Sequence, residues 1–191
     1  MYVNHVRPQY ALNKHSFYLL GMLSPEGRCK TLDASADGYV RAEACGTFFL
    51  STANLRDSKD HIGHASPPFL AILSGSAVNQ DGRSSSLTAP NGPAQQQVIR
   101  QALQGIGSAI SGETRGQYSA SMSPSEVTSL SLHGTGTPLG DPIELGAAAA
   151  VLRAGGDGDG SRAGRTPITL MSSKSWFGHA EPASGEIIRV L

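Results

Sequence analysis

The feature that most constrains the fold is a strand-like segment that runs into a glycine- and threonine-rich turn and then a helix. VTSLSL (127–132) is apolar and of strand length, and HGTGT follows it directly. In the next segment, GDPIELGAAAAVLRA (140–154), Asp141 is expected to cap a helix, with Pro142 in the first turn and Glu144 completing a capping box. Helix initiation thus explains both carboxylates, and a catalytic role is the less favoured alternative.

Further apolar segments alternate with a second helix. The predicted strands are GTFFLST (46–52), FLAILSGSAV (69–78) and, more weakly, PITLMSS (167–173). In NGPAQQQVIRQALQGI (91–106), Pro93 fits the first turn of a helix. The residues that recur on one face of that helix are Ala94, Val98, Ala102 and Ile106. Strands that alternate with helices predict an α/β domain with a substantial sheet.

The remaining segments are predicted from their turn-forming residues. Residues 24–39, SPEGRCKTLDASADGY, predict a structured loop, and residues 11–23 fit a short helix. Residues 108–125 and 154–165 are rich in Gly and Ser with little to bury, so we expect flexible surface loops there. Cys45 precedes the apolar run GTFFL, which predicts a buried strand and a packed thiol.

Composition argues against several classes of function. Charged residues make up 16% of the chain and the formal net charge is zero, so nothing favours binding to nucleic acid or to an anionic membrane. The sequence shows neither a signal peptide nor the run of ~20 apolar residues that a membrane helix needs. Its two cysteines make neither a disulfide framework nor a metal knuckle. We expect a soluble, cytoplasmic protein.

Two histidines follow predicted strands and lie beside glycine. His133 comes directly after VTSLSL, and His179 lies within SSKSWFGHAEPASG. Residues just past strand ends meet at one edge of an α/β sheet, where paired imidazoles could stabilise an oxyanion or carry protons. Thr135 and Thr137 supply hydroxyl groups nearby. A lone loop histidine is more often structural, so this spacing alone is weak evidence.

A second histidine pair suggests a metal site only weakly. His61 and His64 are three residues apart, but a zinc site needs three or four ligands and no partners stand out in the sequence. We therefore predict a solvated loop at this pair and no metal site in the chain.

Four motifs in order resemble one known family. HGTGTPLGDPIE (133–144) and KSWFGHAEPASG (174–185) are similar to the second half of a β-ketoacyl synthase, the condensing domain of modular polyketide synthases. GMLSPEGRCKTLDASADGYVRAEACG (21–46) and AVNQDGRSSSLTAPNGPAQQQVIRQAL (77–103) extend the likeness upstream, so that it covers about residues 21–185. The resemblance implies a thiolase-like fold, with βα layers around a mixed sheet, in a protein that works as a homodimer.

The resemblance also implies a reaction and roles for particular residues. The reaction is decarboxylative Claisen condensation of an acyl thioester with malonyl-type units, which an acyl carrier protein presents on its phosphopantetheine arm. His133 and His179 match the two catalytic histidines and Lys174 the catalytic lysine, while Glu181 matches a supporting acid. The threonines that match those binding the pantetheine arm are Thr135 and Thr137. No bound cofactor is implied.

The chain departs from the family pattern at several points. No segment resembles DTACSSS, which carries the nucleophilic cysteine, and the closing strands of the fold are not recognisable. Cys29 and Cys45 match non-catalytic cysteines. Trp176 and Phe177 stand where Asn-Ile is usual, and a large indole there could alter the pocket. The fold is therefore expected to be incomplete.

Two interpretations of function remain open at this point. The first is part of a polyketide-synthase condensing domain that cannot load an acyl group as an isolated chain, because covalent acyl transfer needs the nucleophile. The second is a non-catalytic ketosynthase-like partner or carrier-docking protein. Retention of His133, Lys174 and His179 favours the first.

Overall fold

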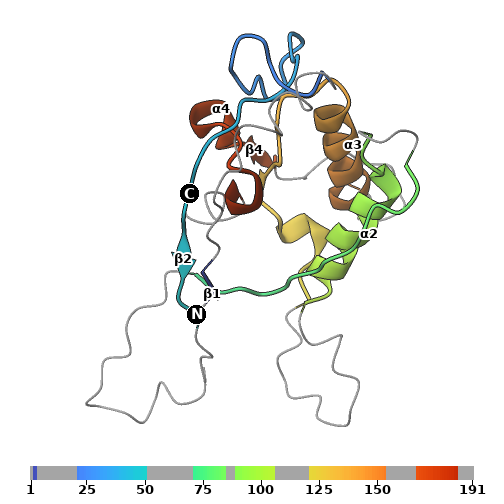
Figure 1. Ribbon diagram of the computed structural model, residues 1–191. Coiled ribbons are helices and arrows are strands. Elements are labelled where there is room, and N and C mark those ends of the chain that lie inside the picture. Colours follow the sequence, from blue (N-terminus) through green and yellow to red (C-terminus); the bar gives the residue numbers. More distant parts are fainter. Residues whose placement is uncertain are drawn as a thin grey trace.

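The computed structural model describes residues 2–3, 21–50, 71–84, 89–105, 121–153 and 167–184 (Figure 1). Its strands are β1 (Tyr2–Val3), β2 (Thr47–Phe48), β3 (Ser129–Ser131) and β4 (Thr169–Met171). Its α-helices are α2 (Gly92–Leu103), α3 (Gly140–Leu152) and α4 (Lys174–Phe177), and its 3-10 helices are η3 (Pro124–Glu126) and η4 (Glu181–Ala183). β1 and β2 form a separate antiparallel pair, with Tyr2 opposite Phe48.

The parallel pair β3–β4 confirms two of the predicted strands. Ser129 pairs with Thr169 and Ser131 with Met171, and the ladder continues through the Leu132 N–H, which donates to the Met171 carbonyl at 2.8 Å. Leu132 is buried. Because the strands are parallel and in register, the segments that follow them leave from the same edge of the pair. This arrangement brings the two predicted histidine segments to one place.

Helices α2 and α3 pack side by side and form the main helical layer (Figure 1). The buried side chains of α3 are small or branched: Ala147, Ala148, Val151 and Leu152. Ala94 is the buried member of the face predicted for α2. Asn91 caps α2 by accepting the Ala94 N–H at 3.1 Å, with Pro93 in the first turn. Both helices thus bury alanine: Ala94 in α2, and Ala147 and Ala148 in α3.

The loop at 24–39 is structured, as its composition predicted. Two backbone hydrogen bonds close the loop. The Ser24 N–H donates to the Tyr39 carbonyl and the Tyr39 N–H donates to the Met22 carbonyl, both at 3.0 Å. Gly38 lies in this crossing with φ +132, where a Cβ would come within 2.6 Å of the Met22 carbonyl oxygen. Cys29 and Tyr39 are the buried apolar residues of this loop.

Two of the predicted strands are wrong or much shorter than expected. Residues 71–78 form no strand, and of 46–50 only Thr47–Phe48 pair, with Phe49 93% exposed. Cys45 is exposed rather than packed. The physical reason is that a longer strand needs a neighbouring strand along its length: β1 offers β2 only two residues, and no described strand pairs with residues 71–78.

Other predicted segments lie wholly or partly outside the described residues. Of the helix expected at 11–23, only residues 21–23 are described, and they form a turn and a bridge. Residues 154–165 lie outside, as does 108–125 except for residues 121–125, where η3 begins with a Ser123–Glu126 capping box that ends one residue beyond this range. Within the described part of the chain, no helix has both the length and the apolar character needed to cross a membrane.

Candidate active site

The carboxylates of Asp141 and Glu144 hold the histidine loop and do not form a capping box. Helix α3 begins at Gly140, two residues earlier than expected, and Leu139 in the N-cap position has no side-chain bond. Glu144 instead accepts the N–H groups of His133 at 2.5 Å and Gly134 at 3.0 Å. The prediction of a capping box is therefore wrong, because the carboxylates satisfy backbone donors of the preceding loop rather than those of their own helix.

Asp141 ties the same loop to a distant segment. Its carboxylate accepts the N–H groups of Gly136 at 3.1 Å and of Leu32 at 2.9 Å, and its side chain is buried. Burial raises the pKa of Glu144, against the opposing effect of the two N–H groups that donate to it. Together the two carboxylates join the loop 24–39, the turn after β3 and helix α3 into one unit.

Gly134 and Gly136 allow the turn after β3 to lie close to residues 30–31. Their φ values are +49 and +79. A Cβ on Gly136 would come within 2.5 Å of the Lys30 backbone nitrogen, and one on Gly134 within 2.7 Å of the Thr31 side chain. The Thr31 hydroxyl donates to the Gly134 carbonyl at 2.6 Å. The HGTGT turn is thus a close-packed joint with residues 30–31.

His179 reaches the site through helix α4 and Gly178. Gly178 has φ +75 and ends the helix against Val40, whose side chain a Cβ would approach to 3.2 Å. The His179 N–H donates to the Val40 carbonyl at 2.8 Å, and the His179 carbonyl accepts the Ala42 N–H at 2.9 Å. The backbone position of His179 is therefore fixed from both sides by residues 40–42.

The two imidazoles lie edge to face. The ring centroids of His133 and His179 are 4.9 Å apart at an interplanar angle of 89°, and Tyr39 packs against His179 at 5.2 Å. The Nδ1 atom of His179 accepts the Glu181 N–H at 3.3 Å. In the neutral ring the proton then resides on Nε2, which can act as a donor.

Both rings are held neutral at pH 7. Burial lowers the pKa of His179 to about 4, helped by the neighbouring His133, Lys174 and Arg41. Burial also lowers the pKa of His133, as does the charge of Lys174, while Asp141 opposes the shift. Neutral imidazoles can each donate one N–H without carrying a charge of their own into the site.

Lys174 is a buried amine beside the histidines. Its residue is 1% exposed, and within the described residues its Nζ has no hydrogen-bond partner. Burial lowers the pKa of Lys174, and the charges of Glu144, Cys29 and Asp141 oppose this. Such an amine is a donor that can respond strongly to negative charge forming close by.

The remaining predicted residues lie around this group. Thr135 is buried, and the Thr137 hydroxyl oxygen accepts the Gly140 N–H at 3.1 Å, which leaves its own proton to donate. Glu181 does not reach the rings with its carboxylate, which pairs with Arg41 at 2.7 Å. All six predicted residues therefore belong to one neighbourhood, and their individual roles stay predictions.

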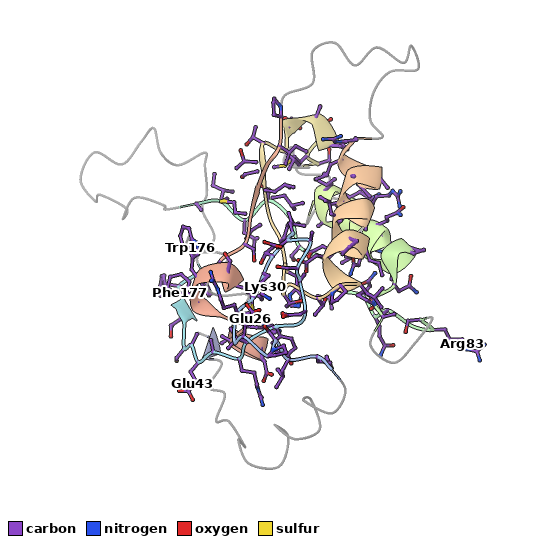
Figure 2. The ribbon with its side chains drawn as sticks, turned by 90° about the horizontal axis from the view of Figure 1, so that it is seen from above. Glu26, Lys30, Glu43, Arg83, Trp176 and Phe177 are labelled. Carbon is purple, nitrogen blue, oxygen red and sulfur yellow. The ribbon has the colours of Figure 1, made fainter. Side chains whose placement is uncertain are left out.

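Trp176 does not enter the site. Its side chain projects outward from α4 with that of Phe177 (Figure 2) and is 80% exposed. The indole therefore leaves the space between the two imidazoles unchanged, in contrast to the effect expected from its size.

Sequence reasoning missed three contributors to the site. Arg41, Tyr39 and Thr31 contact the histidine segments from more than 90 residues away. No periodicity links segments so far apart; the structured-loop pattern contains two of these residues, and the family-like segment 21–46 contains all three without marking any of them as a site residue. Among the described residues no group of three or more His, Cys, Asp or Glu side chains could hold a metal ion. His61 and His64 lie outside the described residues.

Comparison with protein families finds β-ketoacyl synthases. The family model of the β-ketoacyl synthase C-terminal domain matches residues 70–112 and 114–190, and that of the N-terminal domain matches residues 11–55. Polyketide synthase GfsA of Streptomyces halstedii is 47% identical over 85% of this chain and 2% of its own length. The spectinabilin polyketide synthase system protein NorA of Streptomyces orinoci is 44% identical over 85% of this chain and 7% of its own length.

Solved ketosynthase structures show the same fold. The ketosynthase from module 6 of the bacillaene synthase of Bacillus subtilis 168 matches with a TM-score of 0.67 at 29% identity, over 98% of this chain and 29% of that one. The oxazolomycin ketosynthase domain OzmH KS7 of Streptomyces albus matches with a TM-score of 0.72 at 30% identity, over 98% and 28%. This chain spans less than a third of each.

The likeness to these structures shows that the chain is part of a ketosynthase domain with the thiolase-like fold, as the sequence motifs predicted. The chain belongs to the β-ketoacyl synthase family, because the C-terminal-domain model alone matches more than half of its residues. The matched regions run from residue 11 to residue 190 and so extend slightly beyond the 21–185 expected from the motifs.

Proposed function

We propose that this chain supplies the histidine side of the active site in a polyketide-synthase condensing domain. The reaction is decarboxylative Claisen condensation, an acyltransferase reaction between an acyl thioester and a malonyl-type thioester. The observation that carries the proposal is the edge-to-face pair of neutral imidazoles, His133 and His179, 4.9 Å apart beside the buried Lys174.

The proposed reaction needs hydrogen-bond donors where negative charge develops in the transition state. When the malonyl unit loses CO₂, the electron pair of the broken C–C bond moves into an enolate whose charge rests on the thioester oxygen. An N–H from each neutral imidazole can donate to that oxygen, and a fixed, partly desolvated donor stabilises an enolate better than water does. The enolate carbon then attacks the acyl thioester carbonyl and displaces the thiolate of the nucleophile. Lys174 supports this charge electrostatically.

The proposed substrates arrive on an acyl carrier protein. The phosphopantetheine arm is part of that substrate, and Thr135 and Thr137 are the proposed contacts for it. The Thr137 hydroxyl supports this role, because its oxygen is engaged by Gly140 while its proton remains to donate to an amide carbonyl of the arm. We also propose that the complete domain works as a homodimer in the cytoplasm.

Neither cysteine of the chain is proposed as the nucleophile. Cys29 is buried, and burial raises the pKa of its thiol, so little thiolate forms at neutral pH. Cys45 is exposed and lies in no motif for acyl transfer. We expect that this chain alone, offered an acyl thioester, gains no acyl mass in intact-mass spectrometry. A stable acyl adduct on either cysteine would contradict this.

A chimera tests the function. This chain would replace the matching segment of the bacillaene module 6 ketosynthase, which supplies the rest of the domain, and CO₂ release from malonyl-carrier protein would be measured. His133→Ala and His179→Ala should each slow release by about 10²-fold or more, as loss of an oxyanion donor does elsewhere. Arg100→Gln, on the exposed side of α2, is the matched control and should leave the rate unchanged.

The opposite result would favour the alternative function. Equal rates in the histidine variants and the control would remove the catalytic proposal. Co-purification of this chain with a complete ketosynthase or a carrier protein would then support a non-catalytic partner.

A further inference from the structure

Arg41 and Glu181 form an ion pair that joins two segments 140 residues apart. An Arg41 guanidinium nitrogen donates to a Glu181 carboxylate oxygen at 2.7 Å, and the side chains are only 19% and 26% exposed. A pair this sheltered is screened less by solvent and salt than the ordinary surface pair. It is therefore able to hold a side chain in one conformation.

The pair extends a backbone connection that already fixes His179. Arg41 and His179 form an isolated parallel bridge, in which residues 40 and 42 make both hydrogen bonds to His179. The Arg41 side chain reaches two residues further along the partner segment, to Glu181. The bridge sets the position of the His179 backbone, and the ion pair acts on the residue two positions after it.

Glu181 has a positive φ, which is unusual for a residue other than glycine. Its φ is +52, in the left-handed region that L-residues rarely adopt. This conformation directs the Glu181 N–H back to Nδ1 of His179 at 3.3 Å. Two side-chain contacts hold this residue: the Ser184 hydroxyl donates to the Glu181 carbonyl at 2.7 Å, and Arg41 pairs with the Glu181 carboxylate.

We infer that Arg41 is a positioning residue for His179, acting through Glu181 to keep a donor on Nδ1 and so place the imidazole proton on Nε2. The inference deepens the proposed function, in which Nε2–H of His179 donates to the thioester oxygen, and it rests on that proposal for its catalytic meaning. Loss of the ion pair lets Glu181 relax, and the ring then samples the other tautomer and other rotations.

The test reads the tautomer directly and needs no substrate. Long-range ¹H–¹⁵N spectra of the histidine-labelled 191-residue chain distinguish Nε2–H from Nδ1–H, with the His179 signals assigned by their loss in His179→Gln. In the parent chain Nε2–H should dominate. In Arg41→Gln the Nδ1–H form should rise several-fold, and the His179 titration midpoint should move up from about 4 toward its ordinary value.

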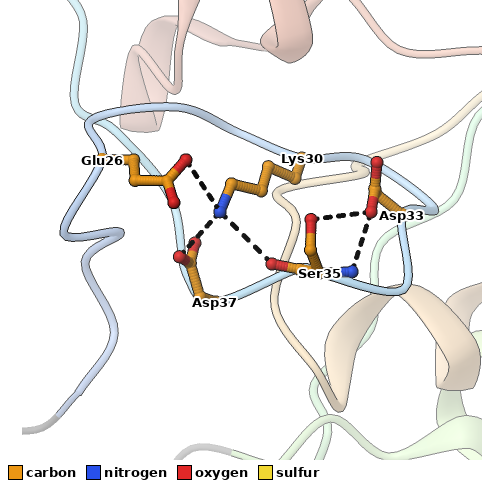
Figure 3. Close-up of polar contacts among 5 residues, drawn as sticks. All are labelled: Glu26, Lys30, Asp33, Ser35 and Asp37. Carbon is orange, nitrogen blue, oxygen red and sulfur yellow. Dashed lines mark hydrogen bonds and ion pairs between the residues drawn. The ribbon is translucent and has the colours of Figure 1, made fainter.

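A matched control breaks a different ion pair. Lys30 binds Asp37 at 2.8 Å and Glu26 at 3.2 Å within the loop 24–39 (Figure 3). Lys30→Gln removes these contacts without touching Glu181, so the His179 spectrum should not change. An equal tautomer change in Lys30→Gln would overturn the inference, because general loosening of the loop would then explain the effect.

Two further variants sharpen the test, and Glu181→Gln keeps it decisive if Arg41→Gln folds poorly. Glu181→Gln should give the same tautomer change, and the Arg41→Gln/Glu181→Gln double variant should add nothing to it if Arg41 acts through Glu181. Additive effects, or an unchanged tautomer ratio in folded Glu181→Gln, would overturn the inference. Neither result bears on CO₂ release by the chimera, so failure here is distinct from failure of the proposed function.

Discussion

His133 and His179 can stand ring to ring because neither is charged at neutral pH. Two imidazolium rings with centroids 4.9 Å apart would repel each other, and burial would penalise both charges. The lowered pKa of each ring removes this conflict. At the residue scale, the environment therefore converts two potential bases into two neutral donors.

This neutrality makes stability depend on pH. The unfolded chain binds a proton at His179 near pH 6.5 and the folded chain only near pH 4, so the unfolded state binds more protons between these values and stability falls as the pH falls. The full shift corresponds to about 3 kcal/mol, which solvent screening of the partly exposed ring reduces to about 1–2 kcal/mol. His179→Gln should remove this part of the decline in urea unfolding measured from pH 7 to pH 4.

The groups that face His179 remain in that variant: Tyr39, His133, Lys174, Arg41 and Glu181. The pKa of His133 is also lowered, so His133 still makes stability fall with falling pH in this variant. A slope as steep in His179→Gln as in the parent chain would show that His179 is not the group responsible.

At the scale of elements, the site depends on how closely the HGTGT turn packs under residues 30–31. The turn carries no side chain at 134 or 136, and three of its N–H groups, those of His133, Gly134 and Gly136, donate to Glu144 and Asp141 of α3. Strand β3, the turn and α3 thus behave as one rigid βα unit. A change that lifts the turn should displace His133 as well.

Gly136→Ala should destabilise the fold by about 2–4 kcal/mol. The added Cβ meets the Lys30 backbone nitrogen at 2.5 Å, and φ is +79, so steric overlap adds to the cost of left-handed backbone. Gly146→Ala, in α3 with open space around it, should instead stabilise by about 0.5–1 kcal/mol through helix propensity. Urea unfolding of both variants checks this, and equal effects would contradict the packing argument.

At the scale of the whole molecule, several large apolar side chains face solvent. Among the described residues the two most exposed are Phe49, next to β2, and Val78, at the end of 71–78, at 93% and 94%. Exposed apolar side chains in such number are typical of surfaces that associate with other protein. The chain spans less than a third of the ketosynthase structures that it matches, which is consistent with further protein covering these segments in the complete domain.

We therefore expect the chain alone to self-associate. Val78→Lys should lower the mean mass seen by light scattering at a given concentration while leaving the free energy of unfolding unchanged within about 0.5 kcal/mol, because the residue makes few contacts. Arg83→Ser, an exposed polar change a few residues away (Figure 2), is the control. Equal association of both variants would show that this apolar segment is not responsible.

The sequence by itself determined the local units and the residue types of the site. VTSLSL, the HGTGT turn and the following helix could be predicted because a strand, two glycines and an apolar helix each have a local pattern. The same patterns predicted His133, His179 and Lys174, through their likeness to a family.

Only the tertiary structure decided which groups meet. Glu144 binds the histidine loop before α3 rather than its own helix, and Arg41 pairs with Glu181, 140 residues away. Residues 71–78 form no strand, since no described strand lies beside them. A carboxylate accepts any N–H and an apolar segment pairs with any suitable edge, so local pattern leaves the partner open. Tertiary packing determines which partner each group contacts.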